Sequence, residues 1–184
     1  MGCRCDLPWL PKVDEAYIAE MIGGRWRPAW EEAKQNPDFT GTFGTEIITA
    51  IEDAAVHIVK DMEPVIADTA TFTMIHNDLN PGNVLVHDNR EVYFIDWEEA
   101  RYGSLFMDIP LRCGNRKQAE DYRGYLGFFG CEIPQARFAK LYSIASRYLG
   151  LRFMGWNLRE WQHNEQARHG LIKYMEMVTY PLFG

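Results

Sequence analysis

The hydrophobic pattern of the chain changes its period twice, and this change constrains the fold more than any other feature. In residues 1–70 and again in residues 115–184, apolar residues recur at the spacing of a helix. Between these stretches, residues 72–109 carry short apolar runs separated by polar turns, as strands do. The pattern predicts an α+β fold, mainly helical, with one small β-hairpin between two helical blocks.

The first helical block has recognisable boundaries. A short helix is expected over residues 14–21 and should end at Gly23-Gly24. An irregular connection should follow it, marked by Trp26, Pro28, Trp30 and Pro37. The clearest helix follows Thr45 and should end at Pro64, and its apolar residues are Ile47, Ile48, Ile51, Ala54, Ala55, Ile58, Val59 and Met62.

The second helical block predicts three helices. The first passes through Tyr122 and Leu126, and the last ends near Val178. Pro134 opens the long helix between them, which glycines 150 and 155 are expected to break or kink.

Composition limits the class of protein. A length of 184 residues with 47% hydrophobic residues is sufficient for a single domain, placed over residues 1–184. The net charge of −7 and the lack of a basic stripe argue against a nucleic-acid partner. No apolar run reaches the roughly 18 residues of a membrane span, and no signal peptide is seen. Because no CxxC pair occurs, we expect free thiols and a cytoplasmic location, the cysteines being Cys3, Cys5, Cys113 and Cys131.

The polar loop His76-Asn77-Asp78-Leu79-Asn80-Pro81-Gly82-Asn83 carries the chemistry. Two apolar runs follow it, Val84–Val86 and Val92–Ile95, joined by a turn at residues 88–90. If the hairpin centres between residues 89 and 90, Asn83 faces Asp96, and directly opposed Cβ atoms lie about 5 Å apart. One amide oxygen and one carboxylate would then suit Mg²⁺, which takes one or two protein oxygens and fills its other positions with water and phosphate.

In phosphoryl transfer, a carboxylate near the metal accepts the proton of the attacking hydroxyl. Asp78, on the loop before Asn83, is placed for this role. Taken singly, Asp78, Asn83 and Asp96 are ordinary turn or capping residues. Their spacing, His-x-Asp-x4-Asn with a later Asp after a strand, is that of a kinase catalytic loop and favours catalytic and metal-binding roles.

The strings HNDLNPGN and VYFIDWEEA resemble the catalytic segment of the aminoglycoside phosphotransferase and choline kinase family. The resemblance implies a protein-kinase-like C-terminal lobe that uses ATP and Mg²⁺ to phosphorylate a hydroxyl of a small cationic molecule, aminoglycoside or choline-like. It implies that Asp78 is the catalytic base and that Asn83 and Asp96 hold the metal and the nucleotide phosphates. It also implies that His76 supports the loop through hydrogen bonds and that Asp108 braces the loop from behind.

One departure from that family is large. The resemblance implies a smaller β-rich N-terminal lobe with a nucleotide-covering loop and a lysine, and the chain shows neither. Gly23-Gly24-Arg25 does not lie between strands. The chain is therefore either a lobe cut from a longer protein or a natural remnant. We expect weak nucleotide binding by the isolated lobe, an exposed and partly apolar surface around the hairpin and the first residues, and possible self-association.

Two functions remain open at this point: an ATP- and Mg²⁺-dependent phosphotransferase, and a catalytically inactive kinase-like binding or interaction module. Glu98 and Glu99 either face a cationic substrate or form a solvated pair. The aromatic residues of the last third either form a cation-π cage or belong to the core, and they include Trp97, Tyr102, Trp156 and Trp161.

Overall fold

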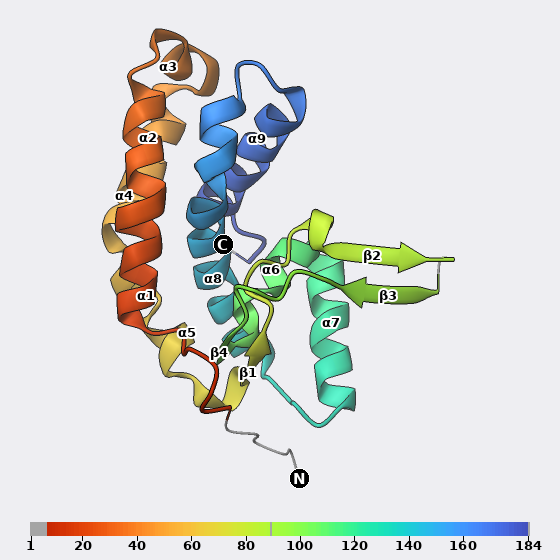
Figure 1. Cartoon of the computed structure of the whole chain (residues 1–184). Helices are drawn as coiled ribbons and strands as arrows, with labels where there is room; N and C mark the ends of the chain where they lie inside the picture. Colours follow the sequence, from red (N-terminus) through yellow and green to blue (C-terminus); the bar gives the residue numbers. More distant parts are fainter. Residues whose placement is uncertain (1–6, 89, 184) are drawn as a thin grey trace. The chain divides into compact units, whose positions relative to one another are not determined.

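The computed structural model describes residues 7–88 and 90–183. Its contacts divide the chain into two compact units, which are described separately. The first comprises the described residues up to Val13 together with Val65–Tyr142, and the second comprises Asp14–Pro64 and the described residues from Ser143. Both small sheets lie in the first unit and the second is helical, so the predicted α+β class is confirmed (Figure 1). A single domain over residues 1–184 stays a prediction.

The second unit is built from helices joined by short turns. Those that lie wholly within it are α1 (Glu15–Glu20), a π-helical turn (Met21–Trp26), α2 (Arg27–Lys34), α3 (Pro37–Phe43), α4 (Thr45–Asp61) and α9 (Glu165–Thr179). The later part of α8 (Gln135–Glu160) also belongs to it, and the short α5 (Glu63–Ala67) contains the unit boundary. The helix predicted after Thr45 is confirmed, but Pro64 lies in the first turn of α5, where a proline is tolerated.

The glycines at 23 and 24 do not end the first helix, contrary to the prediction. The chain passes from α1 through the π-helical turn directly into α2. The residues expected in an irregular connection are helical instead: Trp26 and Trp30 are buried, and their rings stack at 5.5 Å. Burying two such side chains stabilises by about 1.5–3 kcal/mol each, which exceeds the cost of about 1 kcal/mol per glycine.

Helix α8 is continuous through both of its glycines, so the predicted break is wrong. Gly150 lies against the backbone of α9. A Cβ at this position would be 2.7 Å from the backbone oxygen of Tyr174 and 2.8 Å from a methyl group of Val178. Gly150 therefore permits close helix packing, and the burial of both helices offsets its low helix propensity.

Replacing Gly150 by alanine is expected to destabilise the protein by about 1–3 kcal/mol, because the added methyl group overpacks the contact with α9. Gly155 in the same helix is the matched control, since a Cβ there meets nothing within 4 Å. Gly155→Ala should raise stability by up to about 1 kcal/mol through helix propensity alone. Urea unfolding of both variants measures the difference, and equal midpoints would contradict the close packing.

The first unit contains two antiparallel strand pairs. Strand β1 (Phe72–Ile75) pairs with β4 (Arg101–Ser104), and β2 (Val84–His87) pairs with β3 (Glu91–Phe94). Helices α6 (Ile109–Arg112), α7 (Arg116–Phe128) and the start of α8 follow in the chain. Strand β4 was not predicted, because its sequence RYGS lacks apolar alternation. Its glycine lies against Val13 and Ile75, where a larger side chain would collide.

The predicted hairpin exists, but its register differs by one residue. Val84 pairs with Phe94 and His87 with Glu91, which places Ile95 opposite Asn83. Asp88, at the predicted turn, has a positive φ of 49°, a conformation that Asp and Asn adopt more readily than most residues. Because the pairing of the two strands is shifted by one residue from the predicted register, Asn83 does not oppose Asp96.

The apolar side chains of the hairpin are exposed on both of its faces, as expected for the surface around it. They are Leu85, Val86, Val92, Tyr93 and Phe94. Figure 1 shows the two strands as a ribbon extending from the rest of the first unit. Self-association through this surface stays a prediction, and residues 1–6 lie outside the described part of the chain.

Two further expectations concern cysteines and membranes. Cys113 and Cys131 are free thiols, whereas Cys3 and Cys5 lie outside the described residues. Within residues 7–88 and 90–183, no helix combines the length and the apolar character required to cross a membrane.

Candidate active site

The polar loop between β1 and β2 is held from one side by a single carboxylate. Asp108 Oδ2 accepts a hydrogen bond from the backbone N–H of His76 at 2.7 Å, and Oδ1 accepts one from the N–H of Asn77 at 2.8 Å. Both donor residues are buried, with exposed fractions of 2% and 0%. The predicted bracing by Asp108 is confirmed as a contact.

The imidazole of His76 connects this loop to the end of the hairpin. Its Nε2 lies 2.8 Å from the backbone oxygen of Ile95, and since a carbonyl only accepts, Nε2 carries the proton. The ring also packs against Trp97 at 4.6 Å. Within the described chain, Nδ1 has no hydrogen-bond partner. The predicted supporting hydrogen bond is therefore present, while a direct part of His76 in catalysis stays a prediction.

Asn77 is a residue to which the sequence assigned no role. It has a positive φ of 63°, and its Nδ2 donates to the backbone oxygen of Glu99 at 3.1 Å. The amide thus ties the loop to the segment that follows Asp96. The available signal was its residue type, since asparagine is enriched in the left-handed region.

Asp78 and Asn83 form one hydrogen-bonded unit. The side-chain Nδ2 of Asn83 donates to the backbone oxygen of Asp78 at 2.9 Å and to its Oδ2 at 3.0 Å. Asn80 also donates to Oδ2, at 3.3 Å. Among the described residues, none donates to Asp78 Oδ1. The loop therefore fixes the carboxylate through one oxygen and leaves the other able to accept a proton.

Contrary to the prediction, Asp96 is not paired with Asn83 but follows the residue that is. The residue paired with Asn83 is Ile95, whose N–H donates to the Asn83 backbone oxygen at 3.1 Å. Asp96 is the next residue, one Cα step of about 3.8 Å further along the chain. It is exposed, and its positive φ of 64° turns the chain at this point. Asp96 therefore adjoins Ile95, the residue paired with Asn83, and does not face Asn83 directly.

A family model described as the phosphotransferase enzyme family (APH) matches residues 13–156. The chain belongs to that family. A search of curated proteins found no match.

Family membership is accompanied by a structural likeness that extends over nearly the whole chain. A crystal structure of a spectinomycin phosphotransferase in complex with ADP and spectinomycin is similar, with 16% sequence identity and a TM-score of 0.52. The likeness covers 96% of this chain and 59% of that one. It supports the fold class, an α+β kinase-like lobe, and the chain spans less than two thirds of the length of that enzyme.

The donor set of this family member fits a hard divalent cation. Because Asn83 Nδ2 is turned toward Asp78, the amide oxygen faces away from that carboxylate, and no described residue donates to it. The carboxylate of Asp96 is exposed nearby in the chain. Among the described residues, no group of three or more His, Cys, Asp or Glu side chains is arranged to hold a metal. One amide oxygen and one carboxylate, as Asn83 and Asp96 offer, are the kind of protein ligands that Mg²⁺ takes together with phosphates.

The predicted aromatic cage is not supported at Trp161. Its ring lies 5.7 Å from Phe39 and 5.3 Å from Phe43 in edge contacts, and it is buried in the second unit. The core interpretation is therefore confirmed for this residue. Trp156 is exposed, so it does not belong to the core.

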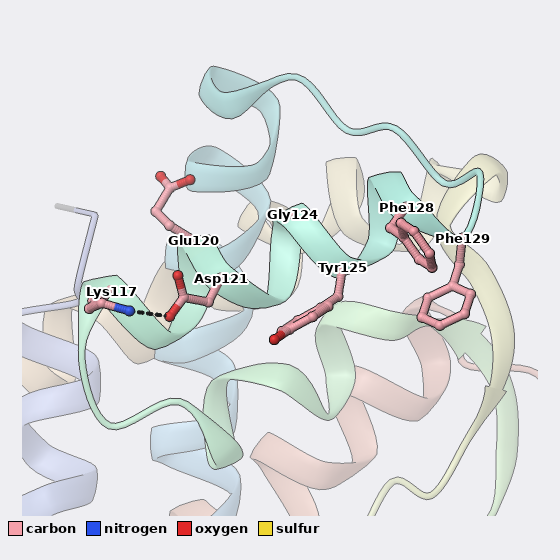
Figure 2. Close-up of a pocket in the computed structure, with 7 residues that line it drawn as sticks. All are labelled: Lys117, Glu120, Asp121, Gly124, Tyr125, Phe128 and Phe129. Carbon is pink, nitrogen blue, oxygen red and sulfur yellow. Dashed lines mark hydrogen bonds and ion pairs between the residues drawn. The ribbon is translucent and has the colours of Figure 1, made fainter.

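A hollow lies on the surface of α7, away from the loop in sequence. Its volume is about 750 Å³, and Figure 2 shows the residues that line it. Phe128 and Phe129 are 82% and 80% exposed, and their rings meet edge to face at 5.2 Å. Its carboxylates are already paired, Asp121 with Lys117 and Glu120 with Arg123. The sequence pattern predicted a helix with apolar residues here, but not that its aromatic side chains are exposed.

Proposed function

We propose that the chain carries the catalytic loop of an ATP- and Mg²⁺-dependent phosphotransferase whose acceptor is a hydroxyl of a small cationic molecule, of the aminoglycoside or choline-like class. The observation that carries the proposal is the Asp78–Asn83 unit, which fixes one carboxylate oxygen and leaves the other without a donor. A carboxylate held in this way suits proton acceptance from an alcohol.

In the proposed reaction, the acceptor hydroxyl approaches Asp78 and its oxygen attacks the γ-phosphorus of ATP. The bond from that phosphorus to the bridging oxygen breaks, ADP leaves, and the hydroxyl proton passes to Asp78 Oδ1. Asn83 and Asp96 would hold Mg²⁺, which when bound supplies charge neutralisation for the phosphates. His76 and Asp108 keep the loop in position through the hydrogen bonds described above.

The cationic class of acceptor is supported by charge. The chain has a net charge of −7, and Glu98 and Glu99 directly follow the Asp96-Trp97 pair. The similar crystal structure contains spectinomycin together with ADP. Acidic side chains near a phosphate site favour an acceptor that brings positive charge.

The decisive experiment measures phosphate transfer from ATP to a panel of amine-bearing alcohols, using the chain alone and joined to a nucleotide-binding lobe of the same family. We expect Mg²⁺-dependent transfer in the joined form. Asp96→Asn should lower the rate at least about a hundredfold, because loss of about 3 kcal/mol of metal-based stabilisation equals two powers of ten.

Asp88→Asn, the same substitution at the exposed hairpin turn, is the matched control and should retain the rate within about threefold, since surface substitutions change little. Transfer that persists in excess chelator would contradict the metal role. Transfer to none of the alcohols, with ATP binding intact, would favour the inactive binding module.

A further inference from the structure

A cavity lies behind the catalytic loop, on the side of Asp108. Its volume is about 180 Å³, and it lies wholly within the first unit. Apolar residues from three segments line it: Met74 and Ile75 of β1, Leu79 of the loop, and Leu105 and Ile109 after β4. Thr73, Met74, Arg112 and Tyr122 line it and are exposed, so the cavity opens to solvent and a ligand can enter it.

The size and chemistry of the cavity define what would fill it. An apolar cavity of about 150 Å³ is sufficient for a benzene ring. The polar residues of its wall are Thr73, Asp108, Arg112, Cys113 and Tyr122, and the charges of Asp108 and Arg112 are opposite in sign. Burial raises the pKa of the Cys113 thiol and of the Tyr122 phenol, so both stay uncharged at neutral pH. A wall that is partly apolar and carries a few polar groups is typical of small-molecule sites.

Two residues of the cavity wall are connected to the loop that carries Asp78. Leu79 directly follows Asp78, and Asp108 holds the backbone of His76 and Asn77 on its other side. A ligand that packs against both residues would restrict the loop. Ligand binding would then be coupled to the loop conformation: the ligand binds more tightly when the loop is ordered, and its binding favours the ordered loop.

We propose that this cavity is a binding site for an uncharged, single-ring organic molecule, and that its occupancy steadies the catalytic loop through Leu79 and Asp108. The proposal goes beyond phosphoryl transfer and does not depend on it, because the cavity and the loop contacts are present whatever reaction the loop performs.

Alkylation of Cys113 by iodoacetamide tests the site, with phenol as the probe. At a phenol concentration about ten times the dissociation constant, labelling of Cys113 should slow about tenfold by mass action. Cys131 is the internal control, because it is also a partly exposed free thiol of the same unit but does not line the cavity. Peptide mass spectrometry reports both rates from one sample, without nucleotide or metal.

Two variants at the cavity mouth sharpen the test. Thr73 is exposed on β1 and lines the cavity, so Thr73→Phe should fill the opening and abolish the effect of phenol on Cys113. Thr73→Val has nearly the same shape as threonine and should preserve the effect. A phenol effect of equal size in both variants would place the probe elsewhere and overturn the proposal.

Hydrogen exchange tests the connection to the loop. Phenol should slow amide exchange of the peptide that contains His76 and Asn77, whose N–H groups bind Asp108. Cys113 labelling that phenol leaves unchanged, or slows equally at Cys131, would show that the cavity holds no ligand. Protection of Cys113 with unchanged exchange in the loop would overturn the steadying effect.

Discussion

Replacing Asp78 by asparagine is expected to lower the rate of phosphoryl transfer by about two to four powers of ten, the usual contribution of a positioned general base. Asparagine has the same shape, and its side-chain oxygen can still accept the hydrogen bonds from Asn80 and Asn83 that fix Oδ2. The substitution therefore removes proton acceptance at Oδ1 while keeping the loop contacts. Steady-state kinetics of the joined form, with turnover number and KM separated, measures the loss.

Asp88→Asn is the matched control for this variant. Asp88 is exposed at the hairpin turn, and asparagine tolerates its positive φ of 49° as well as aspartate does. Turnover of this variant should equal that of the unchanged protein. If Asp78→Asn retains turnover within about tenfold, Asp78 is not the proton acceptor, since a base contributes about a hundredfold or more.

Replacing Asp108 by alanine is expected to reduce the free energy of unfolding by about 2–6 kcal/mol. Two buried N–H groups, those of His76 and Asn77, would lose their acceptor, and each unpaired donor costs about 1–3 kcal/mol. Urea unfolding measures the effect as a lower midpoint with an unchanged slope.

Asp121→Ala serves as the control for Asp108→Ala. Asp121 lies on the surface of α7 in the same unit and pairs only with the exposed Lys117 among the contacts described. Exposed ion pairs contribute little, so its unfolding midpoint should not shift measurably. Equal midpoints for the two variants would show that the bracing carboxylate is unimportant for stability.

Local pattern was sufficient to predict where the loop and the hairpin lie, because short apolar runs and turn residues act over a few positions. It was insufficient for the hairpin register, which differs from the predicted one by one residue. Two registers that differ by one residue fit the same sequence, and only packing and turn geometry select between them.

Residues that act over long range were harder to predict from pattern alone. Strand β4 has no apolar alternation, and it forms because β1 and the segment near Val13 supply its neighbours. Gly150 was predicted to break its helix, but the structure shows that it allows α9 to pack closely against α8. Asp108 was assigned through family resemblance, since nothing near it in the sequence marks a residue that binds a loop about thirty positions earlier.

The sequence separation between Asp108 and the loop that it binds affects when the loop can form during synthesis. Asp108 is 32 residues from His76 and 31 from Asn77, so the ribosome releases the loop well before the carboxylate that holds it. Until Asp108 has been made and β4 has paired with β1, the two peptide N–H groups lack this acceptor. The loop therefore acquires its working shape late, after the chain on both sides of it has been made.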